Sequence, residues 1–90
     1  MYSEILNKMM EGIMKIKDLL ENELLWNKEK IKIINHETNE IIFNTDRFEN
    51  FYLDDDWNKY KDYFINWIES SIDKKINESF ICFYISEIYS

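Results

Sequence analysis

The chain has 90 residues and a net charge of −7, with 46% hydrophobic and 17% aromatic residues. This composition excludes an intrinsically disordered chain, and the length suffices for a single compact domain over residues 1–90. Because phosphate binding needs clustered cations, 18 acidic residues against 11 lysines and arginines disfavour nucleic acid as a direct partner.

The first predicted element is an amphipathic helix from Tyr2 to about Asn27. Its apolar residues recur at intervals of three and four, the period of one helix face. At the edge of this face, Met10 and Met14 are expected to pack under neighbouring strands, with an adaptable interface as the alternative. The residues of the apolar face are Ile5, Leu6, Met9, Ile13, Ile16, Leu20 and Leu24.

Residues 30–45 are predicted to form a β-hairpin, because β-branched and aromatic residues flank a polar run at 35–40. The Asn35 side chain is expected to open the turn, and Asn39 to close it in the left-handed conformation. His36 then lies at the tip of the loop, where a lone histidine is expected to be solvated.

The segment 46–56, DRFENFYLDDD, contains five acids and one arginine, a net charge of −4. Asp46 and Glu49 have the spacing of a capping box, which favours a short helical turn. A third strand over residues 48–53 is the open alternative. Three aromatic residues are expected to hold the segment on the core in either case, and these are Phe48, Phe51 and Tyr52.

A second amphipathic helix is predicted from Leu53 to Asn77. Asp54 or Asp55 is expected to cap its N-terminus, and the remaining aspartates of the triplet 54–56 to meet the positive end of the helix dipole. Tyr60, Tyr63 and Trp67 widen the apolar stripe on one flank beyond what a single core contact needs. The stripe itself consists of Trp57, Phe64, Ile65, Ile68, Ile72 and Ile76.

The last element, Ser79–Tyr89, is predicted to be a strand buried on both faces in the centre of a small sheet. Cys82 within it is interpreted as a small core residue. Because it is the only cysteine, and because the N-terminus lacks the pattern of a secretory signal, a cytoplasmic protein is expected.

These elements together predict an α+β fold with one sheet of three or four strands and two helices packed on it. The expected order is α-β-β-(short helix or strand)-α-β. One sheet with both helices on it would bury every apolar stripe described above.

The sequence carries no recognisable catalytic motif. Nucleophilic catalysis needs a base close to the nucleophile, and the only histidine is far in sequence from the only cysteine. One glycine does not make a phosphate-binding loop. Consecutive aspartates on an entering helix diverge, unlike the alternating ligands of a calcium loop, so Asp54, Asp55 and Asp56 are interpreted as helix-capping residues. No enzymatic activity, metal or cofactor is expected.

The remaining features favour a small acidic inhibitor that binds another protein. A negative patch would steer it to a basic target, and aromatic anchors would hold it there. If the target is a nucleic-acid-binding enzyme, spaced carboxylates can mimic nucleic acid by occupying its basic groove. The expected partner-binding residues are Asp46, Glu49, Asp54, Asp55, Asp56 and Asp62 in the patch, with Tyr60, Tyr63 and Trp67 as anchors.

In size and charge alone, the chain is similar to phage and mobile-element inhibitors of bacterial defence, anti-CRISPR proteins among them, and to immunity proteins that neutralise a toxin.

A second hypothesis is a structural or assembly module: a homodimer in which the wide stripe of the second helix and the edge methionines of the first bury each other. In the simplest alternative, Trp67 is a core residue under residues 48–52. Salt should weaken binding by the inhibitor but not the apolar dimer.

Overall fold

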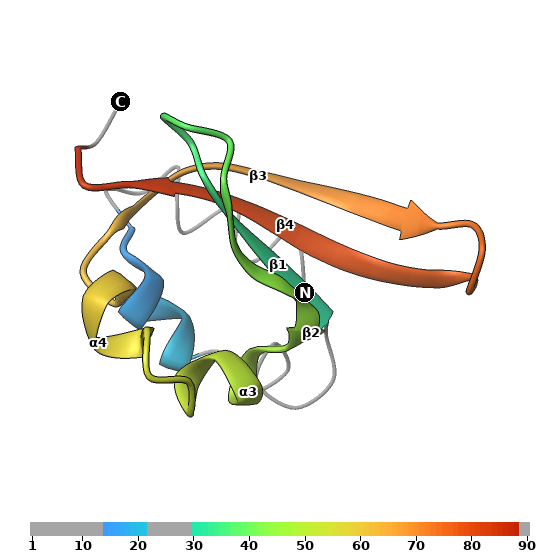
Figure 1. Ribbon diagram of the computed structural model, residues 1–90, viewed down its shortest axis with the longest axis horizontal. Helices are drawn as coiled ribbons and strands as arrows, with labels where there is room; N and C mark the ends of the chain where they lie inside the picture. Colours follow the sequence, from blue (N-terminus) through green and yellow to red (C-terminus); the bar gives the residue numbers. More distant parts are fainter. Residues whose placement is uncertain (1–13, 22–29, 89–90) are drawn as a thin grey trace.

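The computed structural model of the chain describes residues 14–21 and 30–88 (Figure 1). It contains a four-stranded mixed sheet with two short α-helices on one face, which confirms the predicted α+β class. The strands are β1 (Lys30–Asn35), β2 (Ile41–Arg47), β3 (Phe64–Asp73) and β4 (Glu78–Ser86). The helices are α3 (Phe48–Tyr52) and α4 (Trp57–Tyr60).

The sheet has the strand order β2-β1-β4-β3. The outer pairs, β1 with β2 and β3 with β4, are antiparallel, and the central pair of β1 and β4 is parallel. Strand β4 is therefore central, as predicted. The buried core lies between the sheet and the helices, and its residues are Met14, Ile16, Leu19, Ile31, Ile33, Phe48, Phe51, Trp57, Ile65, Ile68, Ile81, Phe83 and Ile85.

The structure describes the middle of the first predicted helix, and the rest, including Met10, lies outside the described residues. Within the described part, Lys15 forms an isolated β-bridge with Phe64, so the predicted helix is wrong at this position, and a 3-10 helix, η1 (Ile16–Glu21), follows it. Leu19 and Ile16 are fully buried, whereas Leu20 is exposed, although the helical pattern placed Leu20 on the apolar face. The difference follows from the geometry, because residues three apart align in a 3-10 helix.

The predicted hairpin is confirmed by β1 and β2. The Asn35 side-chain oxygen accepts hydrogen bonds from the backbone N–H groups of Glu37 and Thr38, at 2.9 and 3.2 Å. Asn39 has a φ of 61°, the left-handed conformation expected for it. His36 is exposed at the tip of this loop, as predicted.

The second predicted helix, Leu53–Asn77, is wrong beyond residue 60, because Phe64–Asp73 form strand β3. Ile65 and Ile68 are both buried, at the three-residue spacing that suggested a helix. That spacing arises from a β-bulge between Ile65 and Trp67, which shifts the alternation of the strand by one residue. A bulged strand thus gave the local pattern of a helix.

The hairpin of β3 and β4 extends beyond the rest of the sheet (Figure 1). Its register runs from Phe64 opposite Ser86 to Asp73 opposite Glu78. Near the end of this extension the side chains of Ile72 and Ile76 are exposed. These two residues, which were predicted to lie on the apolar face of the second helix, are therefore not part of the core.

Candidate protein-binding surface

The short-helix alternative for residues 48–53 is confirmed by α3, but the predicted capping box is not formed. The N-cap of α3 is Arg47, and no side-chain hydrogen bond caps the helix. Asp46 is the next-to-last residue of β2, and its Oδ1 accepts a hydrogen bond from the backbone N–H of Arg47 at 2.7 Å. Because Asp46 is still in extended backbone, its carboxylate lies one residue too early to cap α3.

An aromatic cluster holds the acidic segment on the core. The Trp57 ring lies edge-to-face against Phe48 and Phe51, with ring centroids 5.8 and 5.6 Å apart. The Tyr52 ring packs against the same indole at 5.1 Å. Edge-to-face contacts of this kind stabilise beyond the apolar area that they bury. The loop with Asp54–Asp56 is therefore fixed at both ends, by α3 before it and by Trp57 after it.

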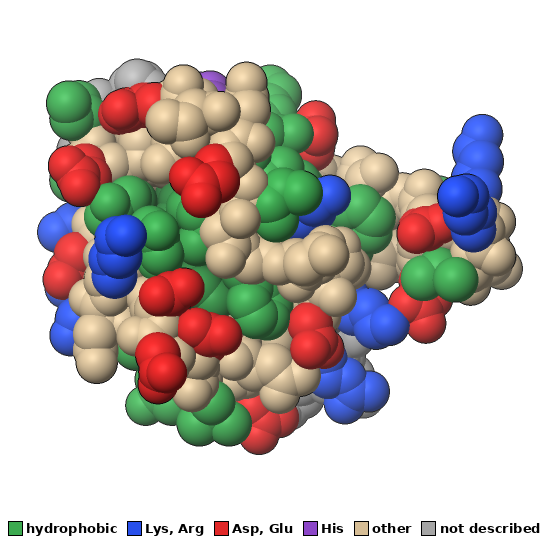
Figure 2. Space-filling model, viewed as in Figure 1, with side chains coloured by type: hydrophobic (Ala, Val, Ile, Leu, Met, Phe, Trp, Pro, Cys, Tyr) green, Lys and Arg blue, Asp and Glu red, His purple; other side chains and the backbone are tan. Residues whose placement is uncertain are grey.

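The acids of this segment lie at the surface. Glu49, Asp54, Asp55 and Asp56 are exposed, and Asp46 is half-buried. Figure 2 shows acidic side chains gathered over α3, α4 and the loop that joins them. A basic partner would thus meet several carboxylates on one short stretch of chain.

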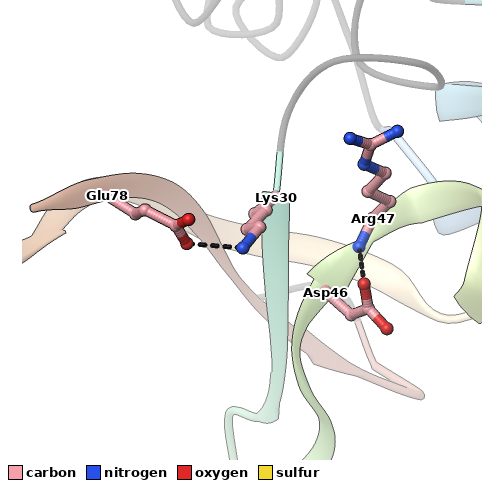
Figure 3. Close-up of polar contacts among 4 residues, drawn as sticks. All are labelled: Lys30, Asp46, Arg47 and Glu78. Atoms are coloured by element: carbon pink, nitrogen blue, oxygen red, sulfur yellow. Dashed lines mark hydrogen bonds and ion pairs between the residues drawn. The ribbon is translucent and has the colours of Figure 1, made fainter. Parts of the chain in front are cut away.

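None of these five carboxylates is paired with a cation among the described residues. The ion pairs found there are Lys17 with Asp62 and Lys30 with Glu78. Figure 3 shows that the guanidinium of Arg47 points away from the carboxylate of Asp46, so the arginine within the segment does not neutralise it. The negative charge of the segment remains available to a partner.

The predicted capping of the second helix by the first aspartates of the triplet is also wrong. The N-cap of α4 is Asp56, and its side chain makes no capping hydrogen bond. Instead Asp54 Oδ1 accepts a hydrogen bond from the backbone N–H of Asp56 at 2.9 Å, which closes a turn before the helix. A four-residue helix offers little dipole to cap. Among the described residues, no group of three His, Cys, Asp or Glu side chains could hold a metal ion.

Asp62 lies in a different electrostatic environment from the triplet. Its Oδ1 is 3.0 Å from the Lys17 ammonium. The hydrogen bond from Lys17 lowers the pKa of the Asp62 carboxyl below its usual value, and the positive charges of Lys61 and Lys15 act in the same direction. With its charge partly balanced, Asp62 contributes less to a negative patch than the aspartates of the triplet do.

The three predicted anchors do not form one flank. Tyr60 and Tyr63 are half-buried against the core, with ring centroids 5.0 Å apart. The Tyr63 hydroxyl donates to Glu87 Oε1 at 2.8 Å, and this hydrogen bond raises the pKa of Tyr63 to about 12. Trp67 is 58% exposed on β3. Since residues 64–73 are a strand, the helix flank that would have joined these rings does not exist.

The apolar residues that do accompany the acids are Tyr52 and Leu53, which are 39% and 70% exposed. They lie between Glu49 and Asp54 in the sequence. Sequence reasoning expected Tyr52 to help hold the segment on the core, which its contact with Trp57 agrees with, and it assigned Leu53 no role. The spacing of the aromatic residues could have identified this pair. Phe48 and Phe51 are three residues apart and are buried on one side of α3, so the positions that follow Phe51 point outward.

No family model, curated protein or solved structure matches the chain. In residues 14–21 and 30–88, no helix combines the length and the hydrophobicity needed to cross a membrane.

Proposed function

We propose that the protein is an inhibitor that binds a basic surface of another protein through one acidic surface. The acidic surface consists of Asp46, Glu49, Tyr52, Leu53, Asp54, Asp55 and Asp56. The observation that supports this proposal is that its five carboxylates reach solvent without a cationic partner among the described residues.

Electrostatics and rigidity both favour such a role. Unpaired carboxylates attract a basic partner over a distance and raise the rate of encounter. The segment is also fixed by the buried ring of Trp57, so little conformational entropy is lost when a partner binds. Leu53, exposed among the acids, supplies apolar contact area at the centre of the surface.

The class of target that this chemistry favours is an enzyme with a basic groove for nucleic acid. Carboxylates on a short segment can take the positions of successive phosphates and so compete with the substrate. Together with the small size of the chain, this favours an anti-defence role of the anti-CRISPR type, in which the inhibited enzyme is a nuclease or another nucleic-acid-binding effector.

The test is capture of such an enzyme from a host lysate, followed by competition. The protein is immobilised, and the captured enzyme is challenged with duplex DNA at low salt. We expect DNA to displace the enzyme, and we expect the triple variant Asp54→Asn, Asp55→Asn, Asp56→Asn to lose capture.

The matched control is a triple variant with the same net charge, Glu37→Gln, Glu40→Gln, Asp73→Asn, which leaves the acidic surface intact. It should capture the enzyme as well as the unmodified protein does. Equal losses in both triple variants would mean that total charge alone governs capture. Full capture by the Asp54–Asp56 variant would contradict the proposed surface.

A further inference from the structure

The sheet has a second face, opposite α3 and α4, which we call the outer face. Along β4 the side chains alternate, so Ile81 and Phe83 point into the core while Cys82 and Tyr84 point to the outer face. Cys82 is buried but is not part of the core cluster, in agreement with this placement. The outer face is built by the same strands that bury the core.

An apolar row crosses the outer face from one edge of the sheet to the other. Tyr84 on β4 lies opposite Trp67 on β3 and opposite Ile34 on β1, and Ile34 lies opposite Ile41 on β2. At the two ends of the row, Trp67 is 58% exposed and Ile41 is 51% exposed. We call these four residues the apolar row.

A β-bulge creates this row. Without the extra residue between Ile65 and Trp67, strand alternation would turn Trp67 toward the same side as the buried Ile65. An exposed Trp beside other large apolar side chains is typical of an interface, where tryptophan is the residue most often found at the energetic centre. The bulge therefore places an exposed tryptophan on the outer face.

The next row along the outer face carries opposite charges. Cys82 on β4 lies between Lys32 on β1 and Glu69 on β3. The Tyr84 hydroxyl donates to Glu69 Oε1 at 2.9 Å and so holds this carboxylate in place. Burial raises the pKa of the Cys82 thiol. The negative charge of Glu69 raises this pKa further and the positive charge of Lys32 lowers it, so both charges influence the thiol that lies between them. Within the described residues Lys32 has no ion pair.

We propose that the outer face binds the outer face of a second copy of this chain, about a two-fold axis that runs along β4. Rotation about this axis brings β1 of one copy over β3 of the other, because these strands flank β4 on its two sides. Lys32 then faces the partner's Glu69, and Ile34 faces the partner's Trp67. Packed sheets lie about 10 Å apart, a gap that facing long side chains span.

The charged row selects this orientation. The alternative two-fold axis also lies in the plane of the interface but crosses the strands at a right angle. It would place each strand over the same strand of the partner. Lys32 would then face the partner's Lys32, and Glu69 the partner's Glu69, and both contacts would repel. Only the axis along β4 joins opposite charges at both ends of the row.

The same row explains why the occupant is a second copy. A chain with a net charge of −7 repels itself over most of its surface. In the charged row, however, one lysine balances one glutamate, and at the far end of β1 Lys30 is paired with Glu78 (Figure 3). The outer face is thus complementary to itself, whereas the acidic surface is not.

The experiment measures the mass of the free protein by light scattering and by sedimentation over a concentration series. We expect a dimer, and we expect Trp67→Ser to raise the dimer dissociation constant by about tenfold or more. Ile34→Ser, which removes the side chain that faces the partner's Trp67, should act in the same direction. The control is Ile76→Ser, which removes an equally exposed side chain from the end of the β3–β4 hairpin and should leave the dimer unchanged.

The charge pairing has its own test. Lys32→Glu and Glu69→Lys should each be monomeric, because each places like charges face to face in the dimer. Mixed in equal amounts, the two variants should form a heterodimer, since both contacts then join opposite charges. Circular dichroism of each variant checks that the fold is kept.

A monomer at every concentration would overturn the proposal. So would a dimer that neither Trp67→Ser nor Ile34→Ser weakens, because the contact would then lie elsewhere. If the single charge variants are monomeric and their mixture also stays monomeric, the axis along β4 is wrong.

Discussion

Two tryptophans of this chain have opposite environments. Trp57 is buried and contacts three aromatic rings, whereas Trp67 is largely exposed on the other side of the sheet. Their contrast separates a residue that stabilises the fold from one that is available for binding. The sequence pattern placed both on one helix, Trp57 on its apolar stripe and Trp67 on its flank, whereas the structure places Trp57 in α4 and Trp67 in β3.

We expect Trp57→Ala to lower the free energy of unfolding by about 3–5 kcal/mol, because it removes the ring that holds Phe48, Phe51 and Tyr52 together. Trp67→Ala is the matched control and should cost less than about 1 kcal/mol. Denaturant unfolding at a concentration where the chain is monomeric measures both. A comparable loss in the two variants would contradict the assignment of Trp57 as the anchor.

At the level of single residues, the sequence predicted backbone roles better than side-chain partners. Asn35 and Asn39 occupy the turn positions foreseen for them, because those roles depend on local conformation alone. The caps assigned to Asp46 and Asp54 are absent, because a cap requires knowing where the helix begins. The pairing of Asp62 with Lys17 joins residues far apart in the chain, which no local pattern reveals.

The hairpins depend on two asparagines with positive φ, Asn39 at 61° and Asn77 at 53°. Asparagine tolerates this conformation better than other residues with a Cβ, and glycine tolerates it best. We expect Asn39→Ala and Asn77→Ala each to destabilise the protein by about 1 kcal/mol, and the glycine variants to be nearly neutral. Thermal unfolding measures the differences.

The control for this prediction is Asn58→Ala, at an exposed position in α4. There the backbone is helical, and alanine has the better helix propensity. Asn58→Ala should therefore leave stability unchanged or slightly raised. An equal loss in all three alanine variants would show that the backbone conformation is not the cause.

At the level of elements, the strands of the first hairpin and the last strand followed from alternation and β-propensity. Strand β3 did not, because its bulge placed Ile65 and Ile68 three residues apart and so imitated a helix. Only the pairing with β4 determines that these residues form a strand, and such pairing is a tertiary contact that a local sequence pattern does not contain. The acidic segment was located correctly, but the apolar residues beside it were identified only once α3 showed which side is buried.

Across the whole molecule, the proposed binding surfaces lie on opposite faces of one sheet. The acidic surface is carried on the side of α3 and α4, and the outer face is on the other side (Figure 1). Figure 2 shows acidic side chains over the helices and the loop that joins them, while the end of the β3–β4 hairpin carries both lysines and acids. A dimer through the outer face therefore leaves both copies of the acidic surface open to a target.

This separation predicts that salt affects the two contacts differently. Capture of a target depends on unpaired carboxylates, and the Debye length falls from about 10 Å at 0.1 M salt to about 3 Å at 1 M. The proposed dimer depends mainly on the apolar row, whose burial salt does not screen. Raising the salt over this range should abolish capture while light scattering still reports a dimer.

The Asp54–Asp56 variant should dimerise without capturing a target, and Trp67→Ser should capture a target as a monomer. Because distant sites act independently, a variant that loses both properties together would mean that the two surfaces are one.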